Sequence, residues 1–284
     1  MTTAVAFNRI KAYSGFVKLE HTVFSLPLIF SGAVLGGHGW PSARLAGLIL
    51  LAAIGGRVVA MGLNRLIDAE IDAHNPRTRQ RELPRGAMQQ GEAWAIVAVA
   101  GALYAASAAA IAPICLWLSP LPVALFVIYP YLKRWTALAH LGLGLAWSMA
   151  PLGGWLAASQ SLQDIAQAGW LWLFSVLWLA GFDVIYATMD EAFDRQAGLH
   201  SLPARLGTSR ALRVAAIFHV LSFLCLVMLR QQLPGMGGVW WLAAIAVLFI
   251  WQHAVAARRP EFAFFNLNAA QGFAVLGLVV GGRG

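Results

Sequence analysis

The chain has 284 residues, of which 60% are hydrophobic and only 11% are charged. A soluble domain carries about 25% charged residues, so this composition excludes a water-soluble globular protein and predicts that lipid surrounds most of the chain. The net charge of +8 does not indicate a nucleic-acid-binding protein, because the basic residues gather in particular loops between apolar segments.

Apolar segments recur along the whole chain. About 20 apolar residues cross a bilayer as a helix, and backbone groups in lipid must pair within their own segment. We therefore expect an all-α integral membrane bundle of about nine helices, forming a single domain over residues 1–284. In chain order the expected spans are about 20–38, 43–66, 92–111, 113–132, 137–158, 169–190, 211–230, 238–257 and 265–282.

The basic residues are distributed unevenly between the two sides of this predicted bundle. Only Arg44, Arg230 and Arg283 fall on one side, and Arg57 falls within a span. The positive-inside rule then predicts a multi-pass protein of the bacterial inner (plasma) membrane with a cytoplasmic N-terminus and an external C-terminus. The first residues are expected to be a cytoplasmic lead-in, not a cleavable signal. The predicted cytoplasmic side carries the other sixteen basic residues, which are Arg9, Lys11, Lys18, Arg65, Arg77, Arg79, Arg81, Arg85, Lys133, Arg134, Arg195, Arg205, Arg210, Arg213, Arg258 and Arg259.

The first of two acidic clusters covers residues 64–72, at the predicted cytoplasmic end of the second span. It reads NRLIDAEID. Asn64, Asp68 and Asp72 are spaced by four residues, so a helix places them on one face. Glu70 falls off that face and is expected to meet solvent or an arginine.

The second cluster covers residues 183–194, at the same end of the sixth span, and reads DVIYATMDEAFD. Asp183, Asp190 and Asp194 follow one another at i, i+7 and i+11. A continuous helix again places these three on one face, with Tyr186 beside them.

Polar stripes at membrane depth carry a large desolvation cost and usually mark a functional site that faces the bundle interior. Carboxylate and amide oxygens on two facing helices suit Mg²⁺. A basic loop containing Leu-Pro follows each cluster, at Leu83-Pro84 and Leu202-Pro203. This weak repeat predicts two four-helix pseudo-repeats around a central site.

Acids and bases at one membrane boundary suit a lipophilic diphosphate. Metal ions neutralise the diphosphate, Arg and Lys bind its outer oxygens, and the apolar remainder lies between helices. Solvated helix ends that pair with neighbouring arginines would explain one such cluster, but two in corresponding places favour a site.

These residues resemble the UbiA superfamily of intramembrane prenyltransferases. The first cluster resembles the family's N-D-x-x-D-x-x-x-D element, and the second its D-x-x-Y-x-x-x-D-x-x-x-D form. The segment 129–134, YPYLKR, resembles the family's turn between helices four and five. Segments 18–24 and 198–205 are similar to the subgroup that acts in 4-hydroxybenzoate polyprenyl transfer or in a related menaquinone step. Arg65 stands where many relatives have Asp, so we expect one acidic group fewer at the site.

The resemblance implies a Mg²⁺-dependent transfer of a polyprenyl group from a polyprenyl diphosphate to an aromatic acceptor. The leading acceptor is 4-hydroxybenzoate, in ubiquinone or menaquinone biosynthesis. A naphthoate, homogentisate, a porphyrin and a futalosine-route intermediate stay open. The expected partners are these substrates and membrane lipid, with no nucleic acid and no required protein partner.

The resemblance also implies roles for the two clusters. Asn64, Asp68 and Asp72 are expected to hold one Mg²⁺, and Asp190 and Asp194 a second with Asp183 nearby. The expected catalytic residues are Asp68, Asp72, Asp190, Asp194 and Tyr186.

Tyr186 would orient the aromatic substrate or hydrogen-bond to Asp190. Basic residues complete the expected site. The residues expected to bind the diphosphate or a substrate carboxylate are Lys18, Arg77, Lys133 and Arg134, together with Asp183 as a further substrate-binding residue.

Two other classes of protein compete with this interpretation. An ion-coupled transporter places its intramembrane acids near the bilayer midplane, often at broken helices, whereas both clusters here lie at one membrane face beside arginines. A non-catalytic assembly or lipid-binding protein leaves the two acidic stripes unexplained. For the enzyme we expect a ring of helices with a lipid-facing opening.

Overall fold

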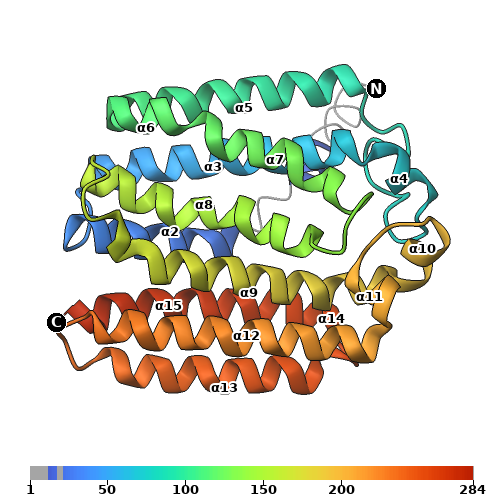
Figure 1. Ribbon diagram of the computed structural model, residues 1–284. Helices are drawn as coiled ribbons and strands as arrows, with labels where there is room; N and C mark the ends of the chain where they lie inside the picture. Colours follow the sequence, from blue (N-terminus) through green and yellow to red (C-terminus); the bar gives the residue numbers. More distant parts are fainter. Residues whose placement is uncertain (1–11, 18–21, 284) are drawn as a thin grey trace.

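The computed structural model describes residues 12–17 and 22–283, and it shows long helices that run between two ends of a bundle (Figure 1). Lys18, predicted to bind substrate, lies outside the described residues. The first half contains α2 (Thr22–Gly37), α3 (Ala43–Ile67), α4 (Ala69–His74), α5 (Gln90–Ile111), α6 (Pro113–Leu118), α7 (Pro120–Leu132) and α8 (Ala139–Ser159). The second contains η2 (Ile165–Ala168), α9 (Gly169–Ala187), η3 (Thr188–Asp190), α10 (Glu191–Gln196), α11 (Leu202–Leu206), α12 (Thr208–Gln231), α13 (Gly238–Ala256), α14 (Pro260–Phe262), η4 (Ala263–Leu267) and α15 (Asn268–Arg283).

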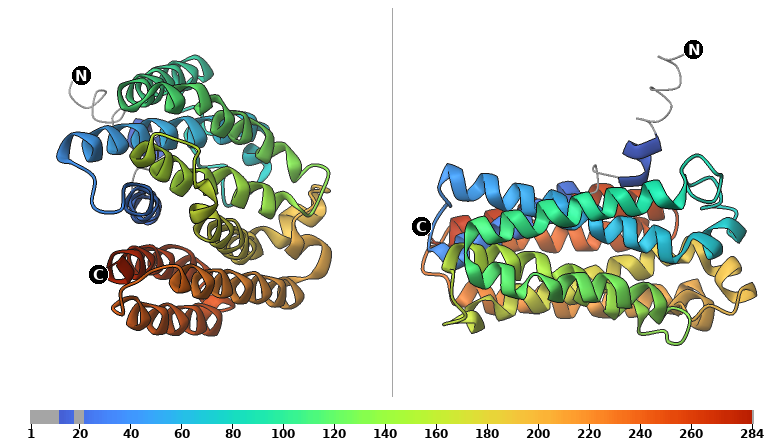
Figure 2. Two further views of the ribbon diagram at one scale, coloured as in Figure 1. Left: turned by 60° about the vertical axis from the view of Figure 1, so that its left-hand side comes forward. Right: turned by 90° about the horizontal axis from the view of Figure 1, so that it is seen from above.

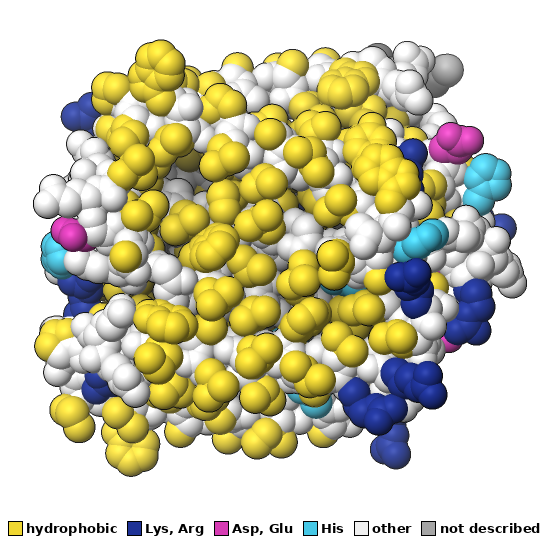
Figure 3. Space-filling view, in the orientation of Figure 1, with side chains coloured by type: hydrophobic (Ala, Val, Ile, Leu, Met, Phe, Trp, Pro, Cys, Tyr) yellow, Lys and Arg dark blue, Asp and Glu magenta, His cyan; other side chains and the backbone are white. Residues whose placement is uncertain are grey.

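The predicted membrane bundle is confirmed. Within the described residues, eight helices are long and apolar enough to cross a membrane, and the apolar part of α2, Ser25–Gly37, is shorter. The expected count of nine is therefore approximate. On the face shown in Figure 3, apolar side chains cover the middle, while Lys and Arg gather toward the two ends. The chain is a multi-pass membrane protein.

Prolines divide the third and fourth spans at the predicted place. Ala112 is extended, with φ −164°, and Pro113 begins α6 at a position where its missing N–H costs no helical hydrogen bond. Pro120 begins α7 in the same way after Ser119. The chain therefore turns back and brings the end of α7 beside the end of α3.

Both acidic clusters lie at one end of the bundle, where α4, α10 and α11 are found (Figures 1 and 2). We call this the motif end. The first cluster keeps its helical register, because the N–H of Asp68 donates to Asn64 at 2.9 Å and that of Asp72 donates to Asp68 at 2.8 Å.

The second cluster differs from the expected continuous helix. α9 ends at Ala187, and the short 3₁₀ turn Thr188–Asp190 separates it from α10. The single helical stripe predicted for Asp183, Asp190 and Asp194 was wrong in this detail.

Small residues let α2 and α8 approach each other closely. A Cβ at Gly32 would overlap the carbonyl of Pro151, and a Cβ at Gly154 would overlap the carbonyl of Ile29. Gly36 lies one turn after Gly32 and meets α8 in the same way. Such small-residue contacts hold helices together in lipid, where burial of apolar surface gives little driving force.

We expect Gly154→Ala to destabilise the bundle by about 1–3 kcal/mol, because the added methyl must push two backbones apart. Gly153→Ala is the matched control, since a Cβ there meets nothing within 4 Å. Thermal unfolding of both variants in detergent measures the difference. Equal midpoints for the two variants would contradict this packing.

Candidate active site

The loop that follows the first cluster joins it to the second. Asn75 Nδ2 donates to Asp190 Oδ1 at 2.8 Å, and Arg77 Nε donates to the same oxygen at 2.8 Å. A second guanidinium nitrogen of Arg77 pairs with Asp190 Oδ2. Arg77 and Asp190 are 113 residues apart in the sequence. This bidentate pair places the two clusters side by side.

Asp68 is the most deeply buried acid of the first cluster, with 3% of its surface exposed. Lys133 Nζ, at the end of α7, lies 2.7 Å from its Oδ2, and Asn64 Nδ2 donates to that oxygen at 3.1 Å. Burial raises the pKa of the Asp68 carboxyl, and the Lys133 ammonium opposes this rise. Among the described residues, Asp68 Oδ1 is buried without a hydrogen-bond partner.

Asp72 continues the same face one turn further on. Its Oδ2 lies 2.6 Å from Arg81 Nη1, and Thr78 Oγ1 donates to its backbone carbonyl at 3.2 Å. Both partners come from the loop that also carries Arg77. The first cluster therefore folds its own basic loop back over its carboxylates.

Tyr186 contacts the cation that holds Asp190. Arg77 Nη1 donates to the Tyr186 hydroxyl at 2.8 Å, and its guanidinium carbon lies 4.8 Å from the ring centroid. Although burial lowers the pKa of Arg77, its hydrogen bonds to Asp190 raise that pKa overall. Arg77 thus stays cationic at every physiological pH.

Asp183 has a different kind of partner. His140 Nδ1 lies 2.6 Å from Asp183 Oδ2, and His140 Nε2 accepts the backbone N–H of Leu202 at 3.1 Å. Since Nε2 accepts, the proton of a neutral ring lies on Nδ1 and is donated to the carboxylate. His140 shows no metal-ligand spacing in the sequence, and only the fold brings it to Asp183.

The other predicted residues of the site also have assigned contacts. Arg134 Nη2 donates to the carbonyl of Ile67 at 2.9 Å, at the last residue of α3. Asp194 is hydrogen-bonded to Ser201. These two contacts tie α7 and the loop before α11 to the motif end.

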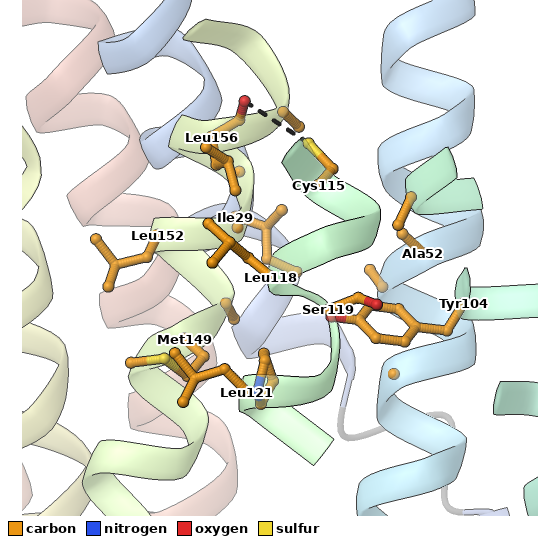
Figure 4. Close-up of a pocket in the computed structure, with 18 of the residues that line it drawn as sticks. Ile29, Ala52, Tyr104, Cys115, Leu118, Ser119, Leu121, Met149, Leu152 and Leu156 are labelled. Carbon is orange, nitrogen blue, oxygen red and sulfur yellow. Dashed lines mark hydrogen bonds between the residues drawn. The ribbon is translucent and has the colours of Figure 1, made fainter. Parts of the chain in front are cut away.

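An apolar cavity of about 400 Å³ lies between α2, α3 and α5 to α8 (Figure 4). Arg57 is the one charged residue that lines it within the described chain, and it is 6% exposed. Its guanidinium carbon lies 4.4 Å from the Trp147 ring centroid. No role was predicted for Arg57 from the sequence, although it is a basic residue inside a span. It lies seven positions before Asn64 and so on the same helical face.

The donor set of the motif end fits Mg²⁺. Carboxylate and amide oxygens are its preferred ligands, and the partnerless Asp68 Oδ1 offers an oxygen at a buried position. Within the described residues, no three His, Cys, Asp or Glu side chains gather as a ready metal cage. Most acids of the motif end are instead bonded to cations that a metal diphosphate would have to displace.

Comparisons with known proteins identify the family of this chain. The family model described as the UbiA prenyltransferase family matches residues 25–266. A 4-hydroxybenzoate octaprenyltransferase of Vibrio campbellii is 29% identical over 281 residues, covering 96% of this chain and 98% of the relative. A 4-hydroxybenzoate solanesyltransferase of Synechocystis is 30% identical over 268 residues, covering 91% and 90%.

Solved structures show the same fold. A UbiA homologue from Aeropyrum pernix, solved in its apo form, is 37% identical with a TM-score of 0.83, covering 90% of this chain and 96% of that one. A UbiA homologue from Archaeoglobus fulgidus, solved with GPP and Mg²⁺, is 20% identical with a TM-score of 0.69, covering 95% and 99%. At that identity the second likeness supports the fold alone.

Arg65 lies next to Asn64. With Arg at this position, the site was expected to have one acidic group fewer. The Arg65 guanidinium pairs with Glu82 and donates to the carbonyl of Gly15 at 3.1 Å. The Arg65 side chain is 5% exposed and lies 5.8 Å from the Phe16 ring. Arg65 therefore joins α3 to the basic loop and to residues 12–17.

We expect Arg65→Asp to lose folded protein, because it leaves Glu82 buried beside a second acid. Breaking a buried pair costs about 3–5 kcal/mol. The double variant Arg65→Glu with Glu82→Arg restores opposite charges and should recover part of the lost stability, as measured by thermal unfolding. Wild-type stability of Arg65→Asp, with tighter Mg²⁺ binding, would contradict a structural role.

Proposed function

The chain belongs to the UbiA prenyltransferase family, and from this premise we propose that it transfers a polyprenyl group from a polyprenyl diphosphate to 4-hydroxybenzoate. The names of its relatives support this acceptor. The reaction would be a step in quinone biosynthesis, with ubiquinone as the favoured product class.

The observation that carries the proposal is the contact between the two acidic clusters through Asn75, Arg77 and Asp190. It gathers carboxylates and cations from both halves of the chain into one place. A polyprenyl diphosphate with its metal ions needs both kinds of group. The carboxylates would turn to the metal, and the released cations would bind phosphate oxygens.

Mg²⁺ would be held by the oxygens of the two clusters, and when bound it supplies charge stabilisation to the leaving diphosphate. Arg77 and Lys133 add two cations to that stabilisation. We assign the metal to Asn64, Asp68, Asp72, Asp190 and Asp194, with Asp183 near them.

Bond changes at the substrates follow from this electrostatic pull. The allylic C–O bond breaks, and its electron pair leaves with the diphosphate. The ring carbon ortho to the hydroxyl forms a bond to the allylic carbon and then loses its proton. Asp183 is suited to accept that proton, because its partner is the imidazole ring of His140, whereas Asp68, Asp72 and Asp190 are paired with Lys or Arg side chains.

The cavity provides for the acceptor and the start of the prenyl chain. Arg57 lies on α3 seven residues before Asn64, about 10 Å along the helix axis. A benzoate carboxylate bound to Arg57 would therefore direct its ring toward the motif end. The remaining wall is apolar and suits a prenyl group.

We further propose that the motif end faces the cytoplasm. The exposed cations at this end support that orientation under the positive-inside rule. They include Arg79, Arg85, Arg195, Arg205, Arg210, Arg213, Arg258 and Arg259.

We expect purified protein to form lipid-extractable product from radiolabelled geranyl diphosphate and 4-hydroxybenzoate only when Mg²⁺ is present. Asp68→Asn and Asp190→Asn each remove a charge from the proposed metal site and should lower kcat/KM about 100- to 1000-fold. Glu70→Gln is the matched control, since Glu70 is an exposed acid of the first cluster. Full activity in EDTA, or in both Asp variants, would sink the proposal.

We expect Arg57→Met to raise the KM for 4-hydroxybenzoate about 10- to 100-fold, because a charge-assisted hydrogen bond is lost. The KM for the donor should stay within about twofold. Arg44→Met, an exposed cation at the other end of α3, is the control. An acceptor without the carboxylate, 4-hydroxybenzyl alcohol, should react equally with wild type and Arg57→Met; equal KM values for 4-hydroxybenzoate would remove Arg57 from the acceptor site.

A further inference from the structure

An irregular turn begins the last long helix. Residues Ala263–Leu267 form a π-helical turn between α14 and α15. A π turn is rare, and it is frequently found at functional sites. The change from i to i+4 winding to i to i+5 winding lets carbonyls of the turn accept hydrogen bonds from other partners.

Two fully buried amides provide those partners. Gln252 Nε2, from α13, donates to the carbonyl of Ala263 at 3.0 Å. Asn268 Nδ2 donates to the carbonyl of Phe264 at 2.7 Å. Gln252 and Asn268 are also bonded to each other at 3.0 Å. Both side chains thus bind the π turn itself.

The same network reaches α9. Trp178 Nε1 donates to Asn268 Oδ1 at 3.1 Å and to Gln271 Oε1 at 2.6 Å. Gln271 Nε2 donates to Gln252 Oε1 at 3.4 Å. All four side chains are completely buried. Polar groups at this depth are costly unless they are bonded, and here they fix α9, α13 and the π turn relative to one another.

The π turn places Phe264 against the residues of the site. Its ring centroid lies 4.3 Å from that of Tyr186 and 5.2 Å from that of Phe182, both on α9. Tyr186 in turn accepts a hydrogen bond from Arg77, which holds Asp190. A continuous series of contacts therefore joins the Gln252 and Asn268 amides to the Arg77–Asp190 pair.

Helix adhesion alone explains only part of this network. The bonds among Trp178, Gln271 and Asn268 are enough to join α9 to α15. The donors that Gln252 and Asn268 direct at the carbonyls of Ala263 and Phe264 add nothing to that contact. Their effect is to hold the irregular turn, and this turn sets the position of the Phe264 ring.

We propose that Phe264, held by Gln252 and Asn268, is a positioning residue that fixes Tyr186 and through it the orientation of Arg77 toward the diphosphate. This inference rests on the proposed function, since it names a determinant of donor binding at the same site. Substitution of a residue that acts in this way should change the KM for the donor and leave the KM for the acceptor unchanged.

We expect Phe264→Leu to raise the KM for geranyl diphosphate about fivefold, because the ring contact with Tyr186 is lost, and to leave the KM for 4-hydroxybenzoate within about twofold. Gln252→Leu should show the same split. Phe249→Leu is the control, because Phe249 is a buried ring on α13 that packs against the His219 ring. It should lower the unfolding temperature without changing either KM.

A double-mutant cycle separates positioning from general packing. Tyr186→Phe removes the hydroxyl that bonds to Arg77. If Phe264 acts through that hydroxyl, Phe264→Leu should not raise the donor KM further in the Tyr186→Phe background. Additive effects of the two changes would overturn the inference, as would an unchanged donor KM in Phe264→Leu.

Direct measurement of geranyl diphosphate binding in the presence of Mg²⁺ distinguishes a failure of this inference from a failure of the proposed function. Wild-type binding that is unaffected by Phe264→Leu would overturn this inference and leave the proposed function standing. A wild type that binds no geranyl diphosphate would overturn both.

Discussion

The bidentate pair between Arg77 and Asp190 is the contact on which the site depends. It joins a loop of the first half to a turn of the second, and Asn75 reinforces it at the same carboxylate. Such a pair has a fixed planar geometry, which a lysine in place of Arg77 would not reproduce. Two acidic clusters that would otherwise repel each other are held together by the cations placed between them.

Charge balance explains the rest of the motif end. Asp68 is paired with Lys133 and Asp72 with Arg81, so these two carboxylates are neutralised before any ligand arrives. A metal diphosphate brings both signs of charge and can replace these pairs without leaving a buried charge alone. The protein can therefore hold a dense set of acids at a membrane boundary without its substrate.

Much of this arrangement could be predicted from the sequence. Long apolar segments, the uneven distribution of basic residues and the spacing of Asn64, Asp68 and Asp72 depend on local periodicity, and periodicity is visible in one dimension. The sequence also predicted that the two clusters lie at the same end. The break after Ala187 was missed, because a 3₁₀ turn leaves no distinct residue pattern when the flanking residues all favour helix.

Other features depend on contacts that sequence spacing does not contain. His140 and Asp183 meet because α8 and α9 pack side by side, and Arg65 pairs with Glu82 because the loop after α4 returns to α3. Gln252 and Asn268 look like isolated polar residues in apolar helices. Only the fold shows that they bind the π turn behind Tyr186.

The central claim is that both clusters form one site for a metal diphosphate. Mn²⁺ binding, followed by electron paramagnetic resonance with and without geranyl diphosphate, tests it most directly. If both clusters form one site, the diphosphate should strengthen Mn²⁺ binding, and either Asp68→Asn or Asp190→Asn alone should abolish this strengthening. Two independent Mn²⁺ sites, each lost only with its own cluster and indifferent to the diphosphate, would contradict it.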